Sequence, residues 1–222
     1  MADSDLIAIT TADELPRSPV EASTSTHARP TPTIPHGGLF SPYSAIQIDA
    51  PPQAVYDAIV DAASWKQWNS FVPSATIKPP SGSTDTSNMT LNASMTFKVN
   101  MTYGTTTVSK EHVNILDPPP NTVQSQTGHI TRICWVLDNK AIITPRFLMH
   151  AERVNEIEDR GDGTTIYRTW ETFGGPLARF VKWKYEAMLK DRFKDWARDL
   201  KMYVERKEAV NKERGTAIEM PA

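Results

Sequence analysis

The chain of 222 residues has very little cysteine, no long apolar run and almost no net charge. The single cysteine, Cys134, excludes an internal disulfide and a cysteine-rich zinc site, and we therefore expect a reducing, cytoplasmic location. No apolar run approaches the ~20 residues that are needed to cross a membrane. A net charge of −2 argues against nucleic acid or an anionic membrane as the main partner.

Sequence motifs for metal or nucleotide chemistry are also missing. The five histidines show no metal-ligand spacing, and there is neither a Gly-rich phosphate loop nor a Gly-x-Ser-x-Gly nucleophile motif. The segment His150-Ala-Glu152 is similar to the His-x-Glu of zinc deaminases, but the Pro-Cys-x-x-Cys of that signature does not follow it. The sequence therefore predicts no metal and no cofactor.

The clearest pattern lies in the last third of the chain. Residues 164–173 are rich in β-branched and aromatic side chains, which is typical of a strand, and Gly174-Gly175-Pro176 ends it. No Gly or Pro follows until Gly215, and apolar residues recur three and four positions apart. These residues are Val181, Tyr185, Leu189, Phe193, Trp196, Leu200 and Tyr203. They predict one helix of about 30 residues, far longer than the usual ~11–12.

The preceding part of the chain predicts a sheet on which this helix can lie. Strand-like segments are residues 43–49, 74–78, 91–103, 105–116, 122–137, 145–158 and 164–173, with two short helices in residues 53–73 after the first strand. Successive hairpins make an antiparallel sheet, and its apolar face needs a cover. We therefore expect an α+β fold in which a curved antiparallel sheet of about six to seven strands grips the long C-terminal helix. The gap between sheet and helix would form a ligand cavity.

The two ends of the chain predict tails. Residues 1–36 hold ten Ser/Thr and five Pro but no aromatic residue, a composition typical of disorder. We expect a disordered tail over residues 1–39, one domain over 40–208 and a flexible tail over 209–222.

Three segments carry a resemblance to a known superfamily. They are Ile48-Asp-Ala-Pro-Pro-Gln-Ala-Val-Tyr56, Trp65-Lys-Gln-Trp-Asn-Ser-Phe-Val-Pro73 and Glu171-Thr-Phe-Gly-Gly-Pro-Leu177. Over about residues 41–207 the chain resembles the START-like (SRPBCC, helix-grip) superfamily, which includes polyketide cyclase/dehydratases, coenzyme Q-binding proteins and relatives of plant pollen allergens. The resemblance implies the fold and a hydrophobic small-molecule ligand. It supplies no common catalytic motif, because the same fold supports several functions.

Candidate site residues follow from strand alternation. If Phe147 and Met149 face the cavity, Arg153 and Asn155 face it too, and we expect Arg168 to join them beside Trp170. A guanidinium there would bind a carboxylate, enolate or phenolate oxygen, with Glu111 or Glu171 as internal partners. Glu171 has the opposite parity from Trp170 and is included in case the strand twists near Gly174. The alternative is that both arginines lie near the rim of the sheet and reach solvent. Candidate catalytic residues are Arg153, Arg168 and Glu171, and candidate ligand contacts are Trp68, Phe71, Met95, Phe97, Trp135, Met149, Asn155 and Trp170.

Two main classes of function fit these features. One is a cofactor-independent enzyme that cyclises, dehydrates or isomerises a polyketide- or terpenoid-like molecule in a dry cavity. The other is a non-catalytic carrier of a lipid or quinone-like ligand, and a co-chaperone-type interaction domain is a third alternative. The partner is a hydrophobic small molecule in the first two cases. The sequence leaves open whether the protein is a monomer or a dimer.

Overall fold

The computed structural model describes residues 21–102, 104–120 and 127–218, and within these ranges the sheet has eight strands. The strands are β1 Ser23–Ser25, β2 Tyr43–Ile48, β3 Ser74–Lys78, β4 Ser94–Thr102, β5 Thr105–Leu116, β6 Ile130–Leu137, β7 His150–Asp159 and β8 Thr165–Gly174. Their order is β1-β2-β8-β7-β6-β5-β4-β3, and neighbouring strands are antiparallel. The α+β fold with an antiparallel sheet is confirmed, and the strand count exceeds the expected six to seven.

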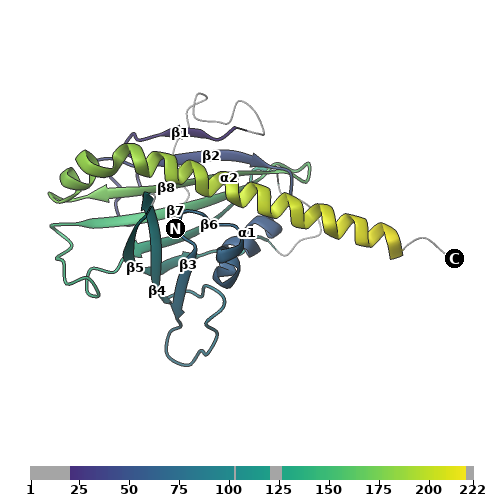
Figure 1. Ribbon diagram of the computed structural model, residues 1–222, viewed down its shortest axis with the longest axis horizontal. Coiled ribbons are helices and arrows are strands. Elements are labelled where there is room, and N and C mark those ends of the chain that lie inside the picture. The colour runs from purple at the N-terminus through teal and green to yellow at the C-terminus, as the bar shows by residue number, and fades with distance from the viewer. Residues whose placement is uncertain (1–20, 103, 121–126, 219–222) are drawn as a thin grey trace.

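The long helix α2, Ala178–Ile218, lies across one face of this sheet, which we call the inner face (Figure 1). The predicted burial of Leu189, Phe193, Trp196 and Leu200 against the sheet is confirmed. At 41 residues the helix is longer than expected, and it continues through residues 209–218 of the expected flexible tail. No helix in the described ranges has both the length and the apolar character needed to cross a membrane.

The turn before α2 depends on Gly175, because its position disfavours any residue with a side chain. Gly175 has a φ of +88°, a conformation that side chains with a Cβ rarely adopt. A Cβ at Gly175 would also lie 2.5 Å from the carbonyl oxygen of Leu148. The amide of Leu177 then donates to that same oxygen at 3.0 Å, which ties the loop before β7 to the first turn of α2.

The two short segments after β2 close the end of the sheet. The first is an α-helix, α1, Pro52–Val60, and the second is a 3₁₀ helix, η2, Ala62–Gln67, so the two expected helices are matched only in part. Trp65 of η2 is fully buried, with its ring 5.0 Å from that of Trp196 and 5.5 Å from that of Phe97. The aromatic segment seen in the sequence is therefore a core element that joins η2, β4 and α2.

Residues 21–39 differ from the disordered tail that we expected. They add β1 to the edge of the sheet and then cover the outer face, which points away from α2. The buried carboxylate of Glu152 accepts hydrogen bonds from the Thr33 amide at 2.6 Å and the Thr33 hydroxyl at 2.7 Å. Trp170 donates from Nε1 to the carbonyl oxygen of Pro30 at 3.2 Å. Composition suggested disorder because the segment has few apolar residues, and hydrogen bonds to the sheet hold it in addition to the buried Ile34. Residues 1–20 and 219–222 of the expected tails lie outside the described residues.

Candidate active site between the sheet and the long helix

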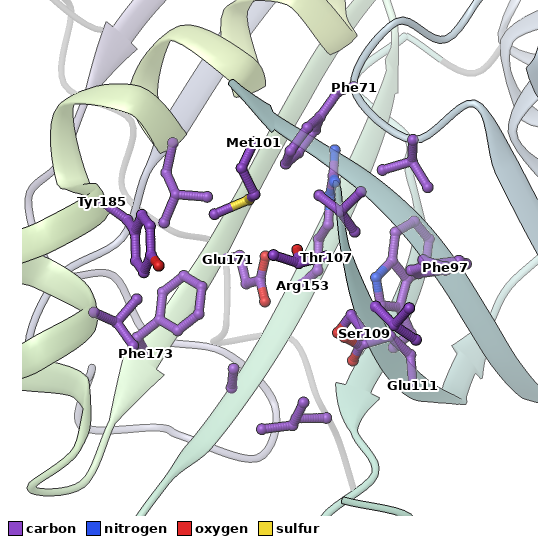
Figure 2. A pocket seen from close by; sticks show the side chains of 18 of the residues that line it. Phe71, Phe97, Met101, Thr107, Ser109, Glu111, Arg153, Glu171, Phe173 and Tyr185 are labelled. Atoms are coloured by element: carbon purple, nitrogen blue, oxygen red, sulfur yellow. Dashed lines mark hydrogen bonds between the residues drawn. The ribbon is translucent and has the colours of Figure 1, made fainter. Parts of the chain in front are cut away.

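A cavity of 260 Å³ lies between the inner face of the sheet and the first turns of α2. Most of its wall is apolar. The polar and charged exceptions include Ser109 and Glu111 of β5, Arg153 of β7 and Glu171 of β8 (Figure 2). The described lining residues are Phe71, Val72, Phe97, Val99, Met101, Thr107, Val108, Ser109, Glu111, Trp135, Leu137, Met149, Ala151, Arg153, Glu171, Phe173, Val181, Tyr185 and Leu189.

Strand register brings the charged residues of the cavity together. Arg153 is paired with Trp135 on β6 and with Glu171 on β8, so the three residues form a row across three strands. Side chains directly opposite on antiparallel strands have Cβ atoms about 4.5–5.5 Å apart. Glu111 lies two positions before Val113, the residue paired with Trp135, and therefore borders the same row. A guanidinium and two carboxyl groups thus meet on the inner face although they are far apart in the sequence.

A chain of buried hydrogen bonds fixes the Arg153 side chain. Its Nε donates to the Thr169 hydroxyl at 3.2 Å, and that hydroxyl donates to Oδ1 of Asn155 at 3.0 Å. The same Asn155 oxygen accepts from the Tyr167 hydroxyl at 2.7 Å, which in turn accepts from Nε1 of Trp196 at 2.7 Å. The network joins β7, β8 and α2, so the position of the guanidinium is set by the packing of the helix on the sheet.

Three aromatic rings lie close to the Arg153 guanidinium. Its Cζ lies 4.0 Å from the ring centroid of Trp196, 4.4 Å from that of Phe193 and 5.4 Å from that of Trp135. Such cation–π contacts offset part of the cost of burying the charge. Burial lowers the pKa of Arg153 from its ordinary value, and nearby Tyr167 and Glu171 oppose this. Its Nη2 is buried and has no hydrogen-bond partner in the described part of the chain.

Glu171 is a cavity carboxyl group that can exchange a proton near neutral pH. Burial raises its pKa from 4.5 to about 7, and the positive charge of Arg153 opposes the rise. The side chain is only partly buried, and Figure 2 shows its carboxylate in the cavity, while the nitrogens of Arg153 point away from it toward Phe71. A carboxyl group with a pKa near the working pH both accepts and returns a proton efficiently.

Glu111 holds its proton more strongly than Glu171. It is 5% exposed and accepts a hydrogen bond from the Ser109 hydroxyl. Burial and then the charge of Glu171 raise its pKa well above the ordinary value, while the Ser109 hydrogen bond and Arg153 oppose this. Burial thus favours the protonated form of Glu111. Among the described residues, no group of three or more His, Cys, Asp or Glu side chains is placed to hold a metal ion.

The structure brings six of the sequence-predicted site residues together at the cavity. They are Phe71, Phe97, Trp135, Met149, Arg153 and Glu171. Three others lie beside the cavity without lining it. Met95 is in the core, and Asn155 accepts a hydrogen bond from the Thr169 hydroxyl that binds Arg153. Trp68 packs against Trp196 with ring centroids 5.4 Å apart.

Arg168 and Trp170 lie on the outer face, and the expectation that they face the cavity is wrong. Arg168 forms an ion pair with Glu158 at 2.6 Å, and Trp170 packs against Tyr43 beneath the N-terminal segment. The error arose because β8 is buried on both faces, so its apolar residues do not identify the inner one. Glu171, which has the opposite parity, faces the cavity without any twist near Gly174. Phe147, used to set the parity of β7, precedes that strand and is 74% exposed.

Glu111 and Ser109 were not among the predicted site residues. Glu111 was considered only as a partner for an arginine. The sequence feature that could have identified Glu111 is its position two residues before Val113, a buried residue on the inner face of β5. That signal is weak because a β-bulge between Val113 and Ile115 interrupts the alternation along the strand.

Residues 42–205 match the family described as polyketide cyclase / dehydrase and lipid transport. The chain belongs to this family. The resemblance to the START-like superfamily is thereby confirmed, and the family supports a role in binding a small molecule. A curated protein similar to this chain is "Oxopyrrolidines biosynthesis cluster protein O" of Penicillium oxalicum. It is 31% identical over 189 residues, which cover 79% of this chain and 92% of that protein.

Solved structures show the fold of the polyketide cyclase / dehydrase family in distant proteins. The Zhui aromatase/cyclase of Streptomyces has a TM-score of 0.55 at 11% identity, with 75% of this chain and 94% of that chain covered. Norcoclaurine synthase of Thalictrum flavum has a TM-score of 0.50 at 10% identity, with 84% of this chain and 98% of that chain covered. At these identities the likeness is one of fold, and residue roles rest on the geometry of the cavity.

Proposed function

We propose that this protein binds a compact hydrophobic carbonyl compound of secondary metabolism and cyclises, dehydrates or isomerises it without a cofactor. The observation that carries the proposal is the pairing of Arg153 with Glu171 across β7 and β8 in a cavity with mainly apolar walls. The family description and the relative named for an oxopyrrolidine biosynthesis cluster support it. A cavity of 260 Å³ is slightly smaller than the ~300–1,000 Å³ range of ligand pockets, which favours a compact ligand.

The first step is removal of a proton from the carbon next to a carbonyl group. The Glu171 carboxylate takes this proton, and the electron pair of the broken C–H bond forms the C=C bond of an enolate. The negative charge passes to the carbonyl oxygen, which accepts hydrogen bonds from the Arg153 guanidinium. Arg153 suits this task because its side chain lines the cavity and is held in place by Thr169.

The second step uses the proton that Glu171 now holds. In a cyclisation, the enolate carbon attacks a second carbonyl carbon of the same molecule, a C–C bond forms, and the new alkoxide takes the proton. Loss of that hydroxyl together with a hydrogen on the neighbouring carbon releases water and completes a dehydration. In an isomerisation, the proton returns instead to a different carbon. The apolar walls exclude bulk water and strengthen the interaction between Arg153 and the developing charge.

The pH dependence of the reaction follows from Glu171. The group acts as a base when it is ionised, and its pKa is about 7. The rate of proton removal should therefore rise with pH through about 7 and then level off. Measured rates between pH 5.5 and 9 test this, and a rate that falls with rising pH over this range contradicts a basic role for Glu171.

The decisive experiment starts from the ligand that accompanies the protein. Native mass spectrometry of protein purified from its own source identifies a co-purifying molecule, which is then incubated with purified protein and followed by chromatography with mass detection. Glu171→Gln should retain binding but lower the rate by about 10²–10⁴-fold, the usual contribution of a general base. Arg153→Met should weaken both binding and turnover. Arg168→Met is the matched control, because that guanidinium lies on the outer face and should leave both unchanged.

The second candidate is a carrier that does not alter its ligand. The apolar walls of the cavity and the words "lipid transport" in the family description favour it. A carrier should release the co-purified molecule chemically unchanged, and Glu171→Gln should then have no effect beyond binding. Turnover by the wild type that is lost in Glu171→Gln excludes this alternative.

A further inference from the structure

We infer that the cavity selects an uncharged ligand and rejects acids, and that Glu171, which lies opposite Arg153, is the residue that sets this selectivity. The inference rests on the proposed function, because it takes the cavity as the ligand site, and it adds the charge class of the ligand. It reverses what the sequence suggested for an inward arginine, namely an acidic ligand bound by the guanidinium.

The charge balance of the cavity is the first argument. Among the described residues that line it, Arg153 is the only cation, whereas Glu111 and Glu171 both contribute carboxyl groups. Glu171 is directly opposite Arg153 in the strand register. When Glu171 is ionised and Glu111 is neutral, the guanidinium is already balanced and the empty site has no net charge. An anionic ligand would add an uncompensated negative charge to a site with apolar walls, which is costly.

The way in which Arg153 is held is the second argument. The described structure leaves its Nη2 buried without a partner, while Nε is used by Thr169. A neutral acceptor, such as a ketone or amide oxygen, can accept a hydrogen bond from the guanidinium without changing the charge of the site. The ring contacts of Arg153 with Trp196 and Phe193 limit its movement toward a larger charged group. Together with the charge balance, these contacts favour a carbonyl oxygen over a free carboxylate.

The two glutamates differ in their expected effect on an acid. Glu111 accepts a hydrogen bond from Ser109, and burial raises its pKa well above the ordinary value, so its protonated form is favoured. Glu171 is partly accessible and changes its charge near neutral pH, so an anion is tolerated only after Glu171 takes up a proton. The other titratable groups near this pair are Arg153 on β7, Tyr167 on β8, Tyr185 on α2 and Asp138 after β6. Burial raises the pKa of Glu171 to about 7, so anion binding should depend on its titration.

A matched pair of fluorescent probes tests this selectivity on the full chain. N-phenyl-1-naphthylamine is uncharged, and 1-anilinonaphthalene-8-sulfonate has the same aromatic body with a permanent negative charge. At pH 8 the wild type should bind the neutral probe at least about tenfold more tightly. Anion affinity should rise about fivefold from pH 8 to pH 7, because binding is linked to protonation of Glu171. The affinity for the neutral probe should stay constant over the same range.

Substitution of the two carboxyl groups separates their roles from general electrostatics. Glu171→Gln should increase affinity for the anionic probe by about tenfold at pH 8 and remove its pH dependence, with the neutral probe changed less than about twofold. Glu111→Gln should change anion binding less than Glu171→Gln does, because the raised pKa of Glu111 already favours its uncharged form. Glu186→Gln removes one charge from α2 outside the cavity lining and should not increase anion binding. Ala151→Phe fills the cavity and should abolish binding of both probes, with a thermal melt to confirm folding.

The outcomes distinguish this inference from the proposed function. If the wild type binds the anion as tightly as the neutral probe, or Glu171→Gln brings no gain, the inference is overturned while the cavity remains a ligand site. If neither probe binds, or Ala151→Phe leaves binding intact, the cavity is not the binding site and the proposed function itself is contradicted.

Discussion

Glu171→Gln should make the protein more stable at alkaline pH, although it removes a group placed at the centre of the site. The folded protein raises the pKa of Glu171 from 4.5 to about 7, mainly because the carboxylate is buried. Folding therefore favours the protonated form. The stability associated with this group is fully present below pH 4.5 and is lost as the pH rises through about 7.

The expected size follows from the same two values. Each tenfold change in proton affinity is worth about 1.4 kcal/mol, so a rise from 4.5 to about 7 corresponds to about 3 kcal/mol. The Glu171 side chain is partly accessible, and solvent screening reduces this to about 2–3 kcal/mol. Gln has the shape of the protonated acid and does not ionise. The free energy of unfolding of the variant relative to the wild type should therefore be near zero at pH 4.5 and higher by about 2–3 kcal/mol at pH 8.

Urea unfolding followed by tryptophan fluorescence at pH 4.5, 6, 7 and 8 measures this difference, because titration of the other groups cancels between the two proteins. Glu213→Gln on the exposed end of α2 is the control and should give a constant offset at all four values. Parallel stability curves for the wild type and Glu171→Gln, or a variant that is less stable at pH 8, would refute the reasoning.

Three further predictions concern the packing around the site. Trp196→Ala should lower the free energy of unfolding by about 3–5 kcal/mol, measured by urea unfolding, since the fully buried indole packs α2 against the sheet. A decrease of less than about 1 kcal/mol would contradict this role. Arg153→Met should raise the pKa of Glu171 further and move the midpoint of its titration, measured by carboxyl NMR, to higher pH; a lower midpoint would contradict the charge balance. A chain that starts at residue 37 should have a free energy of unfolding about 1–3 kcal/mol lower than a chain that starts at residue 21, because Glu152 loses the hydrogen-bond donors of Thr33. Equal melting temperatures of the two chains would show that residues 21–36 do not stabilise the domain.

The sequence by itself determined the elements and most of their order. The 3.6-residue period after Pro176 predicted which residues of α2 are buried, because one face of a long helix is marked by its apolar residues. On β7, alternation placed Arg153 on the same face as Ala151, and both line the cavity. These features are local, so they follow from neighbouring residues along one strand or one helix.

The tertiary structure decided which face of β8 looks into the cavity. Apolar residues occupy both faces of this strand, with Tyr167 and Phe173 on the inner side and Trp170 on the outer side. Alternation defines two sets of residues but does not say which set faces α2 when both are buried. The N-terminal segment covers the outer face through contacts such as Trp170 with Pro30. Only that packing places Glu171, rather than Arg168, in the cavity.

The tertiary structure also decided that Glu111, Arg153 and Glu171 line the same cavity. The three residues lie on β5, β7 and β8, and their proximity depends on the register of the strands between them. Burial of this cluster then sets the pKa of Glu171 near neutrality, an effect that no local pattern predicts because it depends on how much water the surrounding elements exclude. The sequence supplied the charged groups, and the packing of the sheet against α2 made them a site.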